Sequence, residues 1–178
     1  MSNISARNAA VVGMYTAFCV VVGFLLAPIP NIELLTLSVF LGGYFFGMGF
    51  GCLIGAVAMF VFSAFNPWGS GLAFPPLLVS QVVSYGIIGF IGGVVRRLFL
   101  KRDVPAVVFG FIGGVLSSFY YLVVTISTAS IVGFSLKQTG IAYLSSISFS
   151  LLGIGINIIL FALFAPILIR TAWRYLSF

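Results

Sequence analysis

Charged residues are scarce in this chain of 178 residues, and histidine is absent. Only 6% of the residues are charged, with eight Lys/Arg and two Asp/Glu, and there are two cysteines. Soluble domains carry roughly a quarter charged residues. The lack of histidine excludes imidazole-based acid–base chemistry and, with so few cysteines, leaves little from which a transition-metal site could be built. We therefore expect no metal and no bound cofactor.

Apolar side chains, by contrast, dominate the chain. Hydrophobic residues make up 62% of it, and the mean hydropathy is +1.29. A soluble protein of this size buries only about 70% of the surface of its unfolded chain, so this much apolar surface cannot be hidden inside one globule. The composition predicts that lipid is the solvent for much of the surface. We expect no nucleic-acid partner, because the net charge of +6 is explained by membrane topology.

Turn-forming and charged segments divide the chain into six apolar runs, which predict one all-α domain with six transmembrane helices over residues 1–178. Pro28 and Pro30 end the first run, because proline cannot continue a helix. A spanning helix needs about 20 apolar residues, so the second and third runs are short, which fits tilted or broken helices or a tight turn at 47–49. The predicted spans are 9–27, 33–46, 50–65, 74–95, 104–127 and 141–169.

The positions of the cations predict that both termini face the cytoplasm. Loops on the cytoplasmic side of a membrane are enriched in Lys and Arg. With the N-terminus inside, only Lys137 lies outside, and the cytoplasmic cations are Arg7, Arg96, Arg97, Lys101, Arg102, Arg170 and Arg174. The sequence therefore predicts a multi-pass protein of the cell inner or plasma membrane.

No pattern for energy conversion or catalysis is present in the sequence. Ion-coupled transport needs an ionisable group within the membrane, whereas both carboxylates, Glu33 and Asp103, fall at the ends of predicted spans. The chain also lacks a phosphate-cradling loop, the H-E-x-x-H of zinc proteases and any Ser–His pair. We expect neither an enzyme nor a self-powered transporter, so uphill transport would need a partner that supplies the energy.

Polar residues gather in the loops predicted to face outside and in the outer half of span four. A small-molecule site is commonly an apolar, aromatic cavity with a few placed polar groups. The candidates for substrate contact are Asn31, Glu33, Asn66, Trp68, Gln81, Tyr85 and Lys137. The alternative is that these are ordinary loop and interface residues, with Trp68 in the aromatic belt of the membrane surface.

Small residues recur every four positions in two places. Ala9, Gly13 and Ala17 form a smooth face on the first span, where another helix can approach closely. For this face, docking of a partner and packing within the protein both remain open. The second series, from Gly43 to Gly55, crosses the predicted turn and is interpreted as internal packing.

Taken together, these features resemble the substrate-binding S components of energy-coupling factor (ECF) transporters, over the whole length of the chain. The resemblance rests on six short spans with both termini inside, the stripe of small residues on span one, the Pro-Asn-Ile-Glu segment at 30–33 and the Asn-Pro-Trp-Gly loop at 66–69. In this family an A-x-x-x-A face on span one docks onto a shared transmembrane T subunit, which carries two ATPases. In this chain Gly13 takes the middle position of that face.

The resemblance implies uptake of a vitamin or similar micronutrient. The subunit would capture its ligand in an outer pocket and topple in the membrane when the ATPase module drives it. Metal-specific members use a His-rich N-terminal segment, which this chain lacks. The 20 Phe, 7 Tyr and 2 Trp suit a flat or bulky ligand, and riboflavin, thiamine, biotin, a corrinoid or a pyridoxine-like compound fits, with cobalamin slightly favoured. The alternatives are a structural or assembly protein of the bacterial envelope and a transporter that works alone.

Overall fold

The computed structural model describes residues 6–29, 33–99 and 104–175, which form six α-helices and one short 3-10 helix. These elements are α1 (Ala6–Leu26), α2 (Leu35–Phe46), α3 (Met48–Ala64), η1 (Gly71–Ala73), α4 (Pro75–Phe99), α5 (Ala106–Val132) and α6 (Leu136–Tyr175). Within these ranges there is no strand, so the predicted all-α class is confirmed. Four helices, α1, α4, α5 and α6, are long and apolar enough to cross a membrane, whereas α2 and α3 are shorter.

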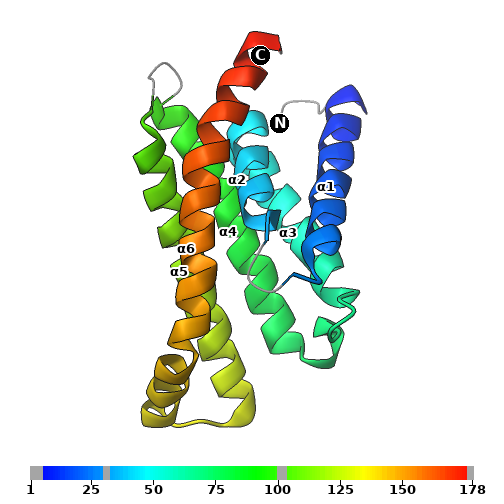
Figure 1. Ribbon diagram of the computed structural model, residues 1–178. Helices are drawn as coiled ribbons and strands as arrows, with labels where there is room; N and C mark the ends of the chain where they lie inside the picture. Colours follow the sequence, from blue (N-terminus) through cyan, green and yellow to red (C-terminus); the bar gives the residue numbers. More distant parts are fainter. Residues whose placement is uncertain (1–5, 30–32, 100–103, 176–178) are drawn as a thin grey trace.

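The first turn of α1 and the last turn of α6 lie at the same end of the bundle, because successive helices alternate in direction (Figure 1). The last turn of α4 carries Arg96 and Arg97, and the last turn of α6 carries Arg174. Arg96 also donates a hydrogen bond of 2.6 Å to the carbonyl of Phe45 in the last turn of α2, which joins the ends of α2 and α4. Lys137 lies at the opposite end, in the first turn of α6.

A hairpin of α2 and α3 packs against α4 through glycines. Only Gly47 separates the two helices, and its φ of 90° is a left-handed conformation that glycine adopts without steric cost. A Cβ atom on Gly43 or Gly51 would overlap the carbonyl oxygen of Gly89, and one on Gly93 would overlap the backbone of Met48. The glycine series of these spans therefore serves internal packing, as the sequence indicated.

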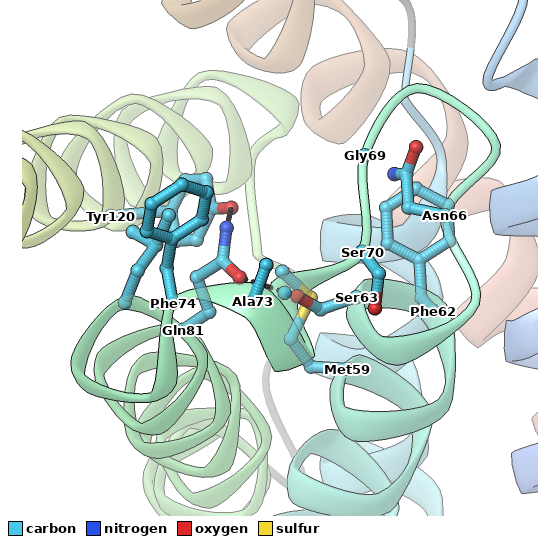
Figure 2. Close-up of a pocket in the computed structure, with 12 residues that line it drawn as sticks. Met59, Phe62, Ser63, Asn66, Gly69, Ser70, Ala73, Phe74, Gln81 and Tyr120 are labelled. Carbon is cyan, nitrogen blue, oxygen red and sulfur yellow. Dashed lines mark hydrogen bonds between the residues drawn. The ribbon is translucent and has the colours of Figure 1, made fainter.

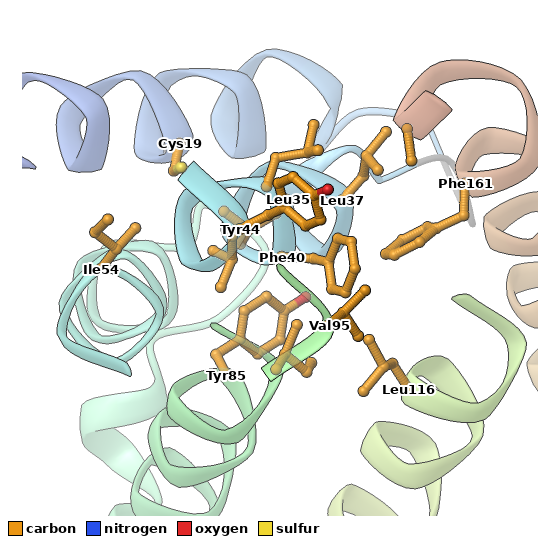
Figure 3. Close-up of a cluster of buried hydrophobic side chains, with 14 of the residues drawn as sticks. Cys19, Leu35, Leu37, Phe40, Tyr44, Ile54, Tyr85, Val95, Leu116 and Phe161 are labelled. Carbon is orange, nitrogen blue, oxygen red and sulfur yellow. The ribbon is translucent and has the colours of Figure 1, made fainter. Parts of the chain in front are cut away.

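The core is centred on α2, whose residues from Leu35 to Tyr44 are all buried. Side chains from α2, α4 and α6 point toward one another there (Figure 3), and the rings of Phe40 and Phe161 lie 5.2 Å apart. α1 contacts α2 and α3, while α5 and α6 form a long hairpin that extends past the rest of the bundle (Figure 1). α6 has 40 residues and continues through Pro166.

Candidate functional site

A pocket of about 340 Å³ lies where the end of α3, the loop that follows it and the first turns of α4 meet (Figure 2). Ligand pockets typically measure roughly 300 to 1,000 Å³, so this one suits a small molecule. Apolar side chains make most of its wall, including those of Met59, Phe62 and Phe74, and its polar side chains are Ser63, Asn66, Ser70, Gln81 and Tyr120.

The loop that closes this pocket is held by its own hydrogen bonds. The Oδ1 atom of Asn66 accepts a bond of 2.9 Å from the backbone N–H of Trp68. The hydroxyl of Ser70 donates to the carbonyl of Ala64 at 2.6 Å and accepts from the N–H of Leu72 at 3.2 Å. Short side chains of this kind stabilise turns by bonding to nearby backbone groups, so the Asn-Pro-Trp-Gly sequence builds a defined rim for the pocket.

Trp68 joins this rim to the connection between α1 and α2. Its side chain is 76% exposed, and the indole N–H donates a hydrogen bond of 3.2 Å to the carbonyl of Ala27. The ring does not line the pocket, but its neighbours Asn66 and Gly69 do. Trp68 is thus placed beside the opening of the pocket.

A chain of hydrogen bonds runs along the polar side of the pocket (Figure 2). The Ser63 hydroxyl donates to Oε1 of Gln81 at 2.7 Å, and Nε2 of Gln81 donates to the Tyr120 hydroxyl at 3.3 Å. The ring of Tyr120 in turn packs edge-on against Tyr85, with centroids 5.2 Å apart. Residues from α3, α4 and α5 are therefore linked from the pocket to the interior of the bundle.

The hydroxyl of Tyr85 belongs to a second group of polar contacts, which surrounds the carboxyl group of Glu33. The Thr36 hydroxyl donates to one carboxyl oxygen at 2.8 Å and the Tyr85 hydroxyl to the other at 3.3 Å. The Thr36 and Tyr85 hydroxyls are 3.0 Å apart. Thr36 and Tyr85 are completely buried, while Glu33 is half-buried. Two of the predicted substrate residues, Glu33 and Tyr85, thus contact each other directly.

Glu33 precedes α2, at the end of an apolar run as the sequence indicated. Its carboxyl group does not face away from the bundle, because it meets Tyr85 near the middle of α4. Asp103 lies outside the described residues.

A buried amide faces this carboxyl group from α6. Asn157 has no exposed surface, and its side chain is close enough to the Glu33 carboxyl group to interact with it. Neither amide atom makes a hydrogen bond of good geometry within the described parts of the chain. A buried amide that lacks good hydrogen bonds lowers the stability of the folded protein, so a functional reason for Asn157 is worth seeking.

One of the predicted substrate residues, Lys137, does not line the pocket. It is exposed in the first turn of α6, where the α5–α6 hairpin begins its return. Asn31 lies outside the described residues. The other five are assembled at or beside the pocket and the buried cluster.

Three important residues of the site were missed by the sequence reasoning. Thr36 and Tyr120 fall within apolar runs and give little signal there. Asn157 gives a clearer one, because it is the polar member of the run Gly-Ile-Asn-Ile-Ile-Leu in the middle of a predicted span. Amides in such positions need partners inside the protein.

The small residues of α1 form a second candidate surface. Ala9, Gly13 and Ala17 are all exposed, and a Cβ atom on Gly13 would meet nothing within 4 Å. Internal packing therefore does not account for this stripe. It differs in this respect from the glycines of α2, α3 and α4, which contact one another's backbone.

A groove of about 450 Å³ between α1, α2 and α6 is a weaker candidate. Its walls are almost entirely apolar, with Ser38 and Thr171 among its few polar residues. It lacks the linked polar groups that orient a ligand. Nor do the described residues contain any group of three or more His, Cys, Asp or Glu that could hold a metal ion.

No protein-family model, no curated protein and no solved structure matches this chain. Function is therefore inferred from the chemistry of the site and not from fold analogy.

Proposed function

We propose that this protein is a membrane-embedded substrate-binding subunit of the ECF S-component kind. It captures a vitamin or similar organic micronutrient from outside the cell for import by a partner module. The observation that carries this proposal is a series of contacts that leads from the pocket to Glu33. Hydrogen bonds join Ser63, Gln81 and Tyr120, the ring of Tyr120 packs on Tyr85, and the Tyr85 hydroxyl donates to Glu33. Polar and ionisable groups inside a membrane carry a large free-energy cost and commonly mark functional sites.

The pocket volume bears on the kind of ligand. A space of about 340 Å³ matches compounds with one or two small rings, such as thiamine, a pyridoxine-like compound or biotin. A corrinoid is much larger than this pocket, so cobalamin becomes the less favoured member of the vitamin class. The aromatic walls of Phe62, Phe74 and Tyr120 suit stacking on a flat ring.

The energy for import would come from a transmembrane T subunit with two ATPases. The exposed stripe at Ala9, Gly13 and Ala17 supports such a partner, since exposed small residues let a second helix approach closely in lipid. The sequence contains no phosphate-cradling loop of its own. The stripe and the pocket involve different helices, so docking and ligand binding can be tested separately.

Native mass spectrometry of the protein purified from its host tests the proposal. We expect a retained organic compound that is lost in Gln81→Leu, because that change removes the hydrogen bonds to Ser63 and Tyr120. A structural or assembly protein of the envelope would carry no such compound. A transporter that works alone would retain the compound but would not co-purify with ATPases.

A further inference from the structure

The Glu33 carboxyl group is surrounded by neutral groups. Its direct partners are the Thr36 and Tyr85 hydroxyls, and Asn157 is the third side chain that acts on it. A carboxylate that leaves water is normally paired with a cation or coordinates one. None of these three partners carries a positive charge, so the negative charge of the cluster is not balanced by its neighbours.

The cationic residues of α4 and α6 lie far from this cluster along their own helices. α2, α3 and α5 contain no lysine or arginine, and the arginine of α1, Arg7, is in its first turn, at the end of the helix farther from Glu33 along the chain. Arg96 follows Tyr85 by eleven residues on α4, which is about 16 Å at the rise of an α-helix. On α6, Lys137 and Arg170 are about 30 Å and 20 Å from Asn157 by the same measure. No cationic side chain is therefore among the described partners of the Glu33 carboxyl group.

Three tyrosines form a continuous group beside this carboxyl group. The Tyr85 hydroxyl donates to it at 3.3 Å. The rings of Tyr85 and Tyr120 are 5.2 Å apart, and those of Tyr120 and Tyr121 are 5.9 Å apart. Aromatic faces attract organic cations, and a carboxylate beside them adds direct charge complementarity.

The amide of Asn157 is a second observation that indicates a ligand. It is fully buried, and both its donor and its acceptor lack a good hydrogen bond among the described residues. A ligand nitrogen that donates to Glu33 could also donate to the amide oxygen of Asn157. Tyr120 connects this position to the pocket, because it lines the pocket and also contacts Tyr85.

We propose that Glu33, Asn157 and the tyrosines around them recognise a positively charged nitrogen, so that the imported compound is a small flat organic cation or protonated base and not an acid. This inference deepens the proposed function and depends on it. The ring of the compound would occupy the aromatic pocket, and its charged nitrogen would be directed toward Glu33.

The test uses the purified full-length protein in detergent and three probes of known charge. Thiamine has a fixed positive charge, pyridoxamine carries a protonated amine, and 4-pyridoxate has nearly the pyridoxamine ring with a carboxylate instead. Binding is measured by calorimetry and by the shift in thermal unfolding. We expect at least one of the two cationic probes to bind and 4-pyridoxate to bind at least tenfold more weakly.

Two variants connect this preference to the cluster. Glu33→Gln keeps the size and the hydrogen-bond acceptor but removes the charge, so it should weaken binding of the cationic probe at least tenfold. Arg97→Gln also removes one charge, of the opposite sign and at an exposed site, and should leave binding unchanged. Asn157→Leu keeps the branched shape of the side chain and removes an unpaired amide. It should therefore weaken binding of the cationic probe without lowering the unfolding temperature. This variant tests the inference if Glu33→Gln fails to fold.

Several outcomes would overturn the inference. Binding of 4-pyridoxate equal to that of the cations, or full binding by a folded Glu33→Gln variant, would show that the site does not select charge. A neutral or acidic compound retained in native mass spectrometry would overturn the inference while leaving the proposed function intact. If no compound is retained and no probe binds, both the proposed function and this inference are wrong.

Discussion

Gly51 and Gly89 face each other so closely that neither position can hold a side chain. A Cβ atom on Gly51 would overlap the carbonyl of Gly89, and a Cβ atom on Gly89 would overlap the carbonyl of Gly51. Two small residues thus bring the backbones of α3 and α4 into direct contact, which is the closest approach that helix packing in lipid exploits. This contact positions Ser63 on α3 and Gln81 on α4 for their hydrogen bond across the pocket.

Gly89→Ala should therefore destabilise the protein. Overpacking a tight contact typically costs about 1–3 kcal/mol, and backbone atoms cannot move aside as a flexible side chain can. Thermal unfolding in detergent measures the change. The matched control is Gly13→Ala on α1, where a Cβ atom meets nothing within 4 Å and the better helix propensity of alanine is worth about 1 kcal/mol. Equal unfolding temperatures for the two variants would contradict the packing described here.

Gly13→Leu should block import without affecting ligand binding. The residues of the stripe are four apart, so each lies about 6 Å further along the helix than the one before. A leucine in the middle would keep a partner helix away from the exposed face. Uptake assays in cells that supply the ATPase module, and co-purification with that module, should both fail.

The same Gly13→Leu protein should fold and should keep the affinity of the wild type for the retained compound. Loss of folding or binding would mean that the stripe packs within the protein. Unchanged uptake would mean either that another face docks or that the protein works alone.

The helical class and the approximate limits of the helices could be predicted from the sequence, because prolines, glycines and charges punctuate long apolar runs. The direction in which the stripe on α1 points could not, since core and lipid are both apolar and hydrophobic periodicity does not distinguish them. The direct contact of Glu33 with Tyr85 could not be predicted either. It depends on where the short helix α2 starts in space, and position along the chain does not specify that.

Tyr85→Phe should weaken the polar cluster. The change removes the hydroxyl that donates to Glu33 and contacts Thr36, and a lost buried hydrogen bond with an unsatisfied partner costs about 1–3 kcal/mol. We expect a lower unfolding temperature and reduced retention of the bound compound in native mass spectrometry. Tyr143→Phe on α6 is the matched control, because no hydrogen bond of the Tyr143 hydroxyl is found in the described part of the chain. A result for Tyr85→Phe no larger than for Tyr143→Phe would argue against the cluster.

Trp68 should report ligand binding through its fluorescence. It lies on the pocket rim and is held by the bond to Ala27, so a flat compound entering the pocket should quench it. Trp173, near the C-terminal end of α6, is remote from the pocket and serves as the internal reference. If Trp68→Phe leaves the quenching by the retained compound unchanged, Trp68 does not sense the site.

Both cysteines should be found as free thiols. Cys19 lies on α1 and is buried, whereas Cys52 lies on α3 and is exposed, and there is no disulfide between them. Intact mass measured without reductant should match two thiols, and a membrane-permeant maleimide should modify Cys52 well before Cys19. A Cys19–Cys52 disulfide would be incompatible with this packing of α1 and α3.

The 40 residues of α6 make it about 60 Å long at the rise of an α-helix, roughly twice the thickness of a hydrocarbon core. α2, with 12 residues, is shorter than that thickness, but it is buried among the other helices, so the mismatch with lipid falls on α6. A bilayer accommodates an apolar helix that is too long for it when the helix tilts or kinks, or when the lipid thickens around it. We therefore expect the tilt of the α5–α6 hairpin to change with the thickness of the bilayer around it.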